Sequence, residues 1–357
     1  MQTVLARKRT MISSLISMHE SRFAATGAEI IWGTGRFVGP KVIEVGLLDK
    51  AGVDVGAKRT FTAPTIIIST GSRAAIPSNV PGLVEAAPLT HITALELDVV
   101  PSHLVILGGG YVGLEFAQAM VRLGSRVTVV ERGGRILKAI DEDVSGALQG
   151  MLQREGVMFV LGREVVGVEG RSGEGVRVKA RKVGRNGAVD DDEGAEEEVI
   201  EASHLLVAAG RTPNTQDIGL GAAGVSVDAK TGHVRVDEFL QTTAPGVYAV
   251  GDCAGSPHFT HVAFDDFRIV RDVLLAPGGK PSIGSRSTAN RQVPSVLFTD
   301  PELAHGKSLI LSHRCVLQLT SECSGFDRAG TPDSANTISH VETSYSGLPS
   351  HTHAVAG

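Results

Sequence analysis

Three glycines at a fixed spacing are the residues of this chain whose arrangement best suits a chemical role. Gly108, Gly110 and Gly113 follow an apolar run at 103–107 and open an amphipathic segment that continues to residue 123. In a Gly-x-Gly-x-x-Gly turn, the first glycine permits a tight turn and the second lets backbone N–H groups approach a pyrophosphate. The third lets the helix lie close to the sheet. Unpaired N–H groups and the positive end of the helix dipole then hold phosphate oxygens, so the spacing predicts nucleotide binding.

An acidic residue completes this unit. A second β-like run at 126–130 ends on Glu131, about 20 residues beyond the glycines, where a carboxylate accepts hydrogen bonds from both hydroxyls of an adenosine ribose. A 2'-phosphate would be repelled there, which favours NAD over NADP. Arg132 and Arg135 follow directly, however, and their guanidinium groups could receive the extra phosphate of NADP. A glycine pattern alone is often only a loop, but the strand, the helix and the acid agree, so we predict dinucleotide binding.

Composition excludes several classes of protein. The chain has 357 residues, enough for two or more domains, and its 43 glycines against 11 Phe, 3 Tyr and 1 Trp fit an α/β protein with many tight turns. A net charge of -5 gives no electrostatic footprint for nucleic acid, and no apolar run approaches the roughly 18 residues that span a bilayer. Cys253, Cys315 and Cys323 lack the spacing of a disulfide framework or a zinc site. We therefore expect a cytoplasmic protein with a small-molecule partner, and no nucleic acid, membrane or metal.

The first 25 residues allow two interpretations. The basic residues at 7–9, with several serines and no acid before Glu20, are similar to a mitochondrial presequence. Four apolar residues also share one face of a helix: Leu5, Ile12, Ile16 and Phe23. We favour an ordinary helix that packs through this apolar face. Short β-like runs follow at 29–32, 36–38, 41–45 and 65–69.

Further elements follow the glycine turn. The pattern predicts a helix at about 144–154, a strand at 157–161, a meander through Val165, Val176 and Val178, and an apolar strand at 205–209. An acidic run at 190–198 inside the meander is typical of a solvated hairpin tip. Another apolar strand at 246–250 ends on Gly251 and Asp252, and a helical pattern occupies 260–275. An aspartate at the end of such a strand is placed to bind hydroxyl or phosphate groups, although alone it is more often a helix cap.

Six separate motifs, taken in order, carry a resemblance to a known family. They are Ile-Ser-Thr-Gly-Ser-Arg at 68–73, Gly-Gly-Gly-Tyr-Val-Gly-Leu-Glu at 108–115, Ala-Gly-Arg-Thr-Pro-Asn-Thr at 209–215, Val-Asp with Gln-Thr-Thr at 236–243, Val-Gly-Asp-Cys at 250–253, and Phe-Thr-Asp-Pro-Glu-Leu-Ala at 298–304. Over about residues 1–304 the chain thus resembles the FAD-dependent pyridine nucleotide-disulfide oxidoreductases, the family of mercuric reductase and dihydrolipoamide dehydrogenase.

The resemblance implies an α/β fold with two Rossmann-like, doubly wound domains, the NAD(P) domain being inserted into a partial FAD domain. The implied boundaries are 1–100 and 216–285 for the FAD-binding domain, 101–215 for the NAD(P)-binding domain, and 286–305 for the start of an interface domain. Residues 306–357 contain many Ser and Thr and no sustained period of 2 or 3.6, so we expect a disordered tail.

The resemblance also assigns binding residues. Those implied to touch FAD are Thr70, Gly71, Ser72, Gly251, Asp252, His258, Phe259, Thr260 and His261. Those implied to line the groove of the nicotinamide cofactor are Gly108, Gly109, Gly110, Tyr111, Val112, Gly113, Glu115, Glu131, Arg132, Val165 and Gly210. Tyr111 resembles the ring that covers the flavin until the nicotinamide displaces it. The implied chemistry is hydride transfer from nicotinamide C4 to flavin N5, and from there to a CxxxxC disulfide and a small-molecule electron acceptor.

The sequence also departs from the family. The family's first Gly-x-Gly-x-x-Gly, its CxxxxC pair and the lysine partner of Glu115 have no counterpart here, so we expect a part of a longer family member. The family dimerises through an interface domain with a His-x-x-x-x-Glu pair, which 306–357 does not contain, so no homodimer, catalytic residue or terminal acceptor is assigned. Two hypotheses stay open. The chain is either an FAD-dependent oxidoreductase or a non-catalytic NAD(P)-binding remnant that cannot retain FAD.

Overall fold

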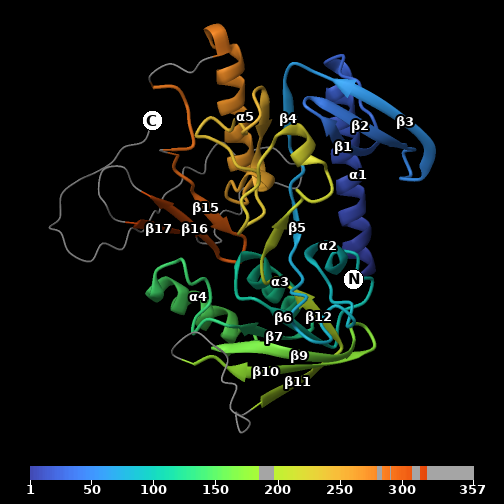
Figure 1. Ribbon diagram of the computed structural model, residues 1–357. Helices are drawn as coiled ribbons and strands as arrows, with labels where there is room; N and C mark the ends of the chain where they lie inside the picture. The colour runs from blue at the N-terminus through green and yellow to red at the C-terminus, as the bar shows by residue number, and fades with distance from the viewer. Residues whose placement is uncertain (185–196, 280–283, 290, 308–313, 320–357) are drawn as a thin grey trace, which may run out of the picture. The chain divides into compact units, whose positions relative to one another are not determined.

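The computed structural model describes residues 1–184, 197–279, 284–289, 291–307 and 314–319 (Figure 1). The chain forms two compact units, residues 1–291 and a second that begins at Gln292. Each unit contains its own sheets.

A parallel four-stranded sheet is the centre of what we call the nucleotide lobe. Its strand order is β12-β6-β7-β8, formed by His204–Val207, His103–Leu107, Arg126–Glu131 and Val157–Leu161. All five residues of β6 are buried, as expected for a parallel strand that is covered on both faces. The Rossmann-like arrangement of parallel strands and crossover helices predicted for this region is confirmed.

Different elements cover the two faces of this sheet. Helices α3 (Tyr111–Arg122) and α4 (Glu142–Arg154) form the crossovers, and α3 buries Leu114, Ala117 and Met120. On the other face lies an antiparallel sheet of β9 (Arg163–Arg171), β10 (Gly175–Lys182) and β11 (Glu197–Ala202), drawn in light green in Figure 1. Val178 and Val168 of this sheet share a core with Val105 and Leu205 of the parallel sheet. The predicted acidic tip lies mostly outside the described residues.

What we call the outer lobe consists of two segments of the chain. One precedes the nucleotide lobe in the sequence and the other follows it. Strand β4 (Ile66–Ile68) pairs in parallel with β14 (Val247–Ala249), and both strands share one core with Phe37. A second sheet is antiparallel and consists of β1 (Gly33–Gly39), β2 (Val42–Leu48) and β3 (Asp54–Thr62). Helix α5 (Thr260–Leu275) buries Ile269 and Val273 against Tyr248. The chain leaves and re-enters this lobe through β5 (Ser72–Ala74) and β13 (Arg211–Pro213), which pair with each other.

Short elements complete the described part of the chain. They are α2 (His91–Ala94) and the 3-10 helices η1 (Leu220–Ala223), η2 (Gly251–Ala254) and η3 (Pro277–Gly279). The predicted strand at 29–32 is wrong, because β1 begins only at Gly33. Strand β3 was not predicted, since all but one of its residues are exposed and it therefore has no apolar face to reveal it.

Helix α1 (Gln2–Ala25) confirms the predicted helix but not its packing. Leu5 is its only buried residue, whereas Ile12, Ile16 and Phe23 are 41%, 51% and 56% exposed. Val4, Met11 and Leu15 of α1 are exposed as well. The apolar residues of this helix are therefore not confined to one narrow stripe. The predicted packing of the apolar face is therefore wrong for Ile12, Ile16 and Phe23 and correct for Leu5.

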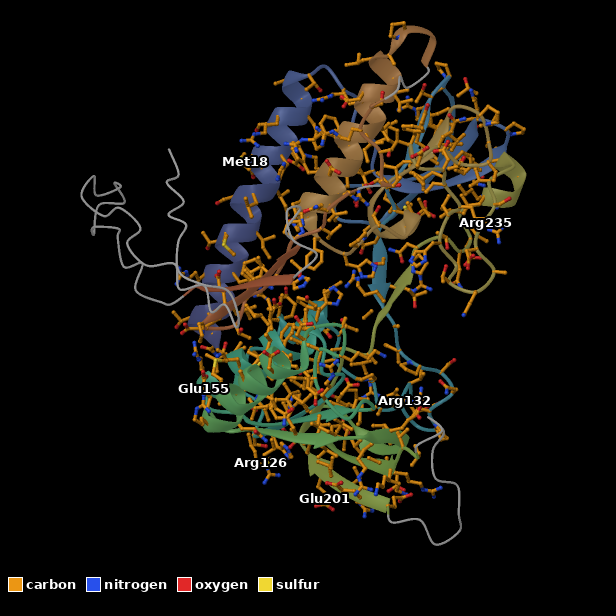
Figure 2. All side chains as sticks on the ribbon, turned by 90° about the vertical axis from the view of Figure 1, so that its left-hand side faces the viewer. Met18, Arg126, Arg132, Glu155, Glu201 and Arg235 are labelled. Carbon is orange, nitrogen blue, oxygen red and sulfur yellow. The ribbon has the colours of Figure 1, made fainter. Side chains whose placement is uncertain are left out.

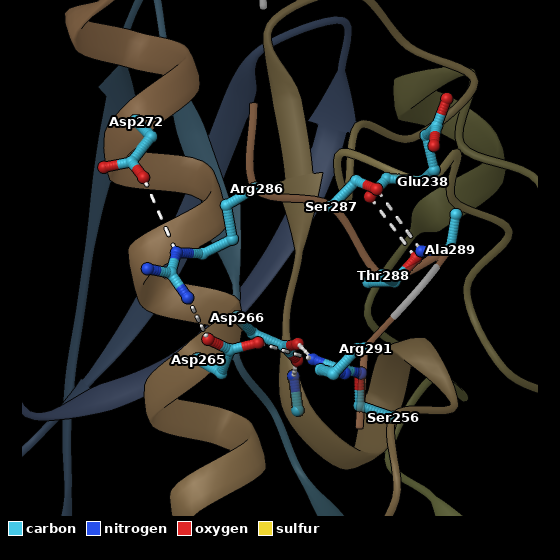
Figure 3. Close-up of polar contacts among 11 residues, drawn as sticks. Glu238, Ser256, Asp265, Asp266, Asp272, Arg286, Ser287, Thr288, Ala289 and Arg291 are labelled. Carbon is cyan, nitrogen blue, oxygen red and sulfur yellow. Dashed lines mark hydrogen bonds and ion pairs between the residues drawn. The ribbon is translucent and has the colours of Figure 1, made fainter. Parts of the chain in front are cut away.

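A buried ion pair closes the end of the first unit (Figure 3). The Asp266 side chain is fully buried, and one of its oxygens accepts from Arg291, whose side chain is 9% exposed. The other oxygen accepts a hydrogen bond from the Gly251 N–H at 2.7 Å. Arg291 also donates to the Ser256 hydroxyl at 3.3 Å. Residue 291 is thereby tied to the start of η2, where the predicted Gly-Asp motif lies.

The second unit contains an antiparallel sheet in the order β15-β16-β17. Its strands are Ser295–Leu297, Glu302–Lys307 and Arg314–Leu319. Strand β17 pairs with β16 along its whole length, residues 314–319 with residues 302–307, whereas the disordered tail stays a prediction. The rest of the tail, with His313, Cys323, His351 and His353, lies outside the described residues.

Candidate dinucleotide site

The glycine turn joins β6 to α3, and its three predicted glycines have different environments. Gly108 has a φ of +109°, and a Cβ added there would lie 2.5 Å from the Ala208 carbonyl oxygen. A Cβ on Gly113 would collide with the Gly108 carbonyl oxygen. Both positions need glycine because the protein's own backbone occupies the space.

Gly110 differs from its neighbours. It is the N-cap of α3, with ordinary extended backbone angles and no side-chain capping hydrogen bond. A Cβ added to Gly110 would meet nothing within 4 Å. The space beside this helix N-terminus is therefore an open cradle that a side chain would fill, and it suits the phosphates of a dinucleotide.

The cradle opens into a cleft of about 590 Å³. Seven of the predicted coenzyme residues line it: Gly108, Gly109, Gly110, Glu131, Arg132, Val165 and Gly210. Tyr111, Val112, Gly113 and Glu115 belong to the first turns of α3 and are not part of the lining. The structure thus gathers residues from the carboxyl ends of β6, β7 and β12 at one edge of the parallel sheet, where open α/β sheets bind ligands.

Several cleft residues were not predicted from the sequence. They are Pro77, Asn79, Val80, Leu83, Leu107, Val130, Leu137, Lys138, Arg163, Glu164, Ala208 and Ala209. Lys138 and Arg163 are the cations among them, and Arg163 forms an ion pair with Glu198, with 3.5 Å between its Nε and a carboxylate oxygen. Lys138 therefore matters most, because it adds positive charge to a cleft predicted to hold a diphosphate. The position of Lys138 and Arg163 soon after β7 and β8 was a usable signal, since loops at the carboxyl ends of parallel strands line such a crevice.

Glu131 ends β7 and faces the glycine turn. Its two oxygens accept backbone hydrogen bonds from Gly109 and from Gly133, each at 2.7 Å. Each carboxylate oxygen has a second lone pair, so the side chain can still accept ribose hydroxyls. The carboxylate therefore sits on the cleft wall at the place the sequence predicts for ribose recognition.

The two arginines that follow are already engaged. Arg132 forms an ion pair with Glu164, with 3.0 Å between the guanidinium Nε and a carboxylate oxygen, and Figure 2 labels it at the edge of the lobe. Arg135 donates to the carbonyl oxygens of Ile140 and Lys138 at 2.8 and 2.9 Å. The guanidinium of Arg135 thus stabilises a backbone loop.

A second polar cluster joins the motifs predicted to contact FAD. The Ser72 hydroxyl donates to the Asp252 carboxylate, although the two residues are 180 positions apart. Arg211 donates to the Ser72 hydroxyl at 2.6 Å and to its carbonyl oxygen at 2.9 Å, and lies 3.4 Å from Asp252. Burial and the neighbouring Arg211 lower the pKa of the His91 imidazole, which favours its neutral form. The role of Arg211 was missed, because its partners come together only in the fold.

Backbone contacts fix the other residues of this cluster. Asn214 donates from its backbone N–H to Gly71 and from its side chain to Thr70, both carbonyl contacts being 2.9 Å long. The Gly251 N–H is occupied by Asp266. Residues 70–72 and 251–252 are therefore held side by side at the carboxyl ends of β4 and β14.

The aromatic residues near the two clusters contact one another. The Tyr111 ring meets the edge of Phe259, with centroids 5.8 Å apart and an interplanar angle of 82°, and Phe259 stacks on His261 at 5.4 Å. Thr260 begins α5, and His258 is exposed. Tyr111 at the start of α3 is thereby linked to the segment that follows the Gly-Asp motif.

The fit to the two predicted cofactors differs. The open cradle, the cleft and Glu131 fit a nicotinamide dinucleotide. For FAD, the structure supplies the Ser72–Asp252 pair, but among the described residues the turn at 108–113 is the one Gly-x-Gly-x-x-Gly that joins a strand to an α-helix. The same spacing at 219–224 surrounds only the short 3-10 helix η1. The residues present therefore provide one side of a flavin site.

The described residues were not found to form a metal site or a membrane-spanning helix. No cluster of three or more His, Cys, Asp or Glu there could hold a metal ion. The buried Cys253 thiol points at the Val250 carbonyl oxygen, 3.2 Å away. No helix in this part of the chain is long and apolar enough to cross a membrane.

Comparison with known proteins gives a consistent result. The family model described as pyridine nucleotide-disulphide oxidoreductase matches residues 8–266. Mitochondrial dihydrolipoyl dehydrogenase of Pisum sativum is 33% identical over 303 residues, which are 84% of this chain and 55% of the relative. Mercuric reductase of Streptomyces lividans is 34% identical over 302 residues, 84% of this chain and 58% of the relative.

Solved structures agree with the sequence relatives. The HOCl-induced flavoprotein disulfide reductase RclA of Escherichia coli matches with a TM-score of 0.71 and 29% identity. The match covers 85% of this chain and 63% of that protein. This chain therefore spans little more than half the length of the curated relatives described above.

Proposed function

Because this chain belongs to the pyridine nucleotide-disulphide oxidoreductase family, we propose that it binds NAD(H) in the cleft beside Gly110 and serves hydride transfer to a flavin. The observation that carries the proposal is the open space at the bare N-terminus of α3, with the Glu131 carboxylate on the same cleft wall. Backbone N–H groups of the turn would hold the diphosphate, and Lys138 would add positive charge.

The preference for NAD over NADP rests on three side chains. The Glu131 carboxylate would repel a 2'-phosphate, and Arg132 is paired with Glu164. Arg135 is held by two backbone carbonyl oxygens and would have to leave them to reach a phosphate. The sequence left Arg132 and Arg135 open as phosphate ligands, and these contacts support their exclusion.

On the flavin side, the chain would contribute positioning and charge. Thr70, Gly71, Ser72 and Asp252 would contact FAD, with Arg211 fixing the Ser72 hydroxyl. Tyr111, in contact with Phe259, would cover the position that the nicotinamide must enter. A bound flavin would supply the hydride acceptor, while the protein aligns the two rings.

A second function has its own supporting observation. Among the described residues, one Gly-x-Gly-x-x-Gly turn joins a strand to an α-helix, and one side of a flavin site is present, which favours an NAD(P)-binding protein that does not retain FAD. In either case we propose a cytoplasmic location and a small-molecule partner, with no nucleic acid or membrane partner. The formal charge of -5 supports the exclusion of nucleic acid. A homodimer is not part of the proposal.

The experiment is an absorption spectrum of the purified chain followed by calorimetric titration with NADH and NADPH. A flavin spectrum that NADH bleaches supports the oxidoreductase. Colourless protein that binds NADH supports the second function. A well-folded chain that gives no heat with either coenzyme would refute both.

The variant Glu131→Ala tests the ribose assignment in the same titration. We expect it to weaken NADH more than NADPH by about 1 to 3 kcal/mol, because hydrogen bonds to a charged acceptor are lost and repulsion of the 2'-phosphate ends. An equal loss for both coenzymes would contradict the assignment of Glu131 to the ribose.

A further inference from the structure

Glu131 makes two contacts that recognition of a ribose does not require. One carboxylate oxygen accepts the Gly109 N–H and the other accepts the Gly133 N–H. Gly109 is the middle residue of the glycine turn, and Gly133 lies in the loop after β7. The Glu131 side chain thus connects the backbone of the glycine turn with the backbone of the loop after β7.

The Gly109 peptide is held from its carbonyl side as well. Its oxygen accepts the Leu137 N–H at 3.0 Å. The space around its α-carbon is also occupied, since a Cβ there would lie 3.1 Å from Ile136 Cγ2 and 3.3 Å from Glu131 Cγ. The middle of the glycine turn therefore rests directly on the loop that Glu131 begins.

That loop is fixed from within. Arg135 donates to the Lys138 and Ile140 carbonyl oxygens, and the buried Ser145 hydroxyl of α4 donates to the Ile136 carbonyl oxygen at 2.7 Å. Hydrogen bonds therefore hold the loop 132–140 in place. The Glu131–Gly109 and Leu137–Gly109 hydrogen bonds connect Glu131 and this loop to the glycine turn.

From this geometry we propose that Glu131 is a positioning residue for the glycine turn, and that it sets the affinity for the diphosphate independently of the ribose hydroxyls. Without the carboxylate, the Gly109 N–H loses its acceptor. The turn then keeps two backbone hydrogen bonds, from the Leu137 N–H to the Gly109 carbonyl oxygen and from the Gly108 N–H to the Val130 carbonyl oxygen. Since the turn presents the phosphate-binding N–H groups, a displacement of even 1 Å would weaken binding markedly. The inference rests on the proposed function, because it takes the cleft as the dinucleotide site.

A ligand without ribose hydroxyls separates the two roles of Glu131. We suggest calorimetric titration with ADP and with 2',3'-dideoxy-ADP, which keeps the diphosphate but offers no hydroxyl to Glu131. If Glu131 positions the turn, Glu131→Ala lowers the affinity for dideoxy-ADP by about tenfold, the equivalent of one charged hydrogen bond. An unchanged affinity for dideoxy-ADP, with weakened ADP, would leave Glu131 with the ribose role alone and overturn the inference.

Glu131→Gln is the second variant. Its amide oxygen can accept one of the two glycine N–H groups, but its NH2 group would face the other donor. We expect a loss of dideoxy-ADP affinity here as well. Glu155→Gln is the matched control, since Glu155 pairs with Arg122 and Gln118 away from the cleft, and Figure 2 shows it on the other side of the lobe from Arg132. It should bind dideoxy-ADP like the unmodified chain.

Amide hydrogen exchange, measured by NMR without ligand, decides the inference even if no nucleotide binds. In Glu131→Gln, exchange at Gly109 and Gly133 should become faster while the amides of β6 keep their protection. Unchanged exchange at both glycines would overturn the inference. Failure of the unmodified chain to bind NADH would instead overturn the proposed function, so the two failures are distinguishable.

Discussion

Alanine at two positions of the glycine turn should separate stability from coenzyme binding. In Gly113→Ala, the new methyl group collides with the Gly108 carbonyl oxygen and lies 3.4 Å from Ile106 Cγ2. The contact reaches ordinary van der Waals separation only if α3 moves away from β6 by roughly 1 Å. Such overpacking costs about 1 to 3 kcal/mol of unfolding free energy. The same movement displaces the N–H groups of α3, so NADH affinity should also fall.

Gly110→Ala is the contrasting variant. Its methyl group meets nothing within 4 Å in the protein, and the backbone angles of Gly110 are open to alanine. The unfolding free energy should fall by no more than about 1 kcal/mol, the cost of a poor N-cap residue. The methyl group nevertheless fills the cradle where the diphosphate would lie, so NADH binding should be lost.

Urea unfolding followed by intrinsic fluorescence gives the stabilities, and calorimetric titration gives the NADH affinities. The reasoning requires Gly110→Ala to be stable but unable to bind, and Gly113→Ala to lose both properties. If Gly110→Ala binds NADH like the unmodified chain, the space beside the N-terminus of α3 is not the phosphate site. If the two variants are equally destabilised, the distinction between backbone clash and open cradle is wrong.

Two further predictions concern the rest of the first unit. Arg291→Met should lower the unfolding free energy by about 3 to 5 kcal/mol, because it leaves the fully buried Asp266 carboxylate without its cation. Arg286→Met is the control, since it breaks half-exposed ion pairs with Asp265 and Asp272. In the same urea titration it should lower the unfolding free energy by less than about 1 kcal/mol. Burial lowers the pKa of the His103 imidazole, so the unfolded chain takes up its proton first as the pH falls. Stability should therefore decline below about pH 6.5, the ordinary histidine pKa, and urea midpoints of His103→Gln should depend less on pH; an identical pH dependence would contradict this.

The elements with strong local signals were predicted well. Strand β8 and helix α5 have the predicted bounds, because an unbroken apolar run and a clear helical period define them within a few residues of sequence. The environment of Gly113 also follows from the motif, since the third glycine is needed wherever the helix lies close to the strand. These features depend on neighbours in the chain.

Features that depend on distant residues were not accessible. Leu5 and Ile16 have the same apolar character, and only the fold shows that the first is buried and the second exposed. In the same way, the sequence left Arg135 open as a phosphate ligand because its carbonyl partners become visible only when the loop is folded. Sequence spacing identified the cleft, but it could not show which charged groups were already occupied.

The pairing of β4 with β14 has a consequence for how the chain is made. Ser72 and Asp252, which follow these strands, are 180 residues apart. At ribosomal rates of about 5 to 20 residues per second, β14 is synthesised roughly 10 to 40 s after β4. All four strands of the nucleotide lobe's parallel sheet emerge within that interval. That lobe can therefore fold on the ribosome before the apolar strand Ile66–Ile68 meets its partner β14.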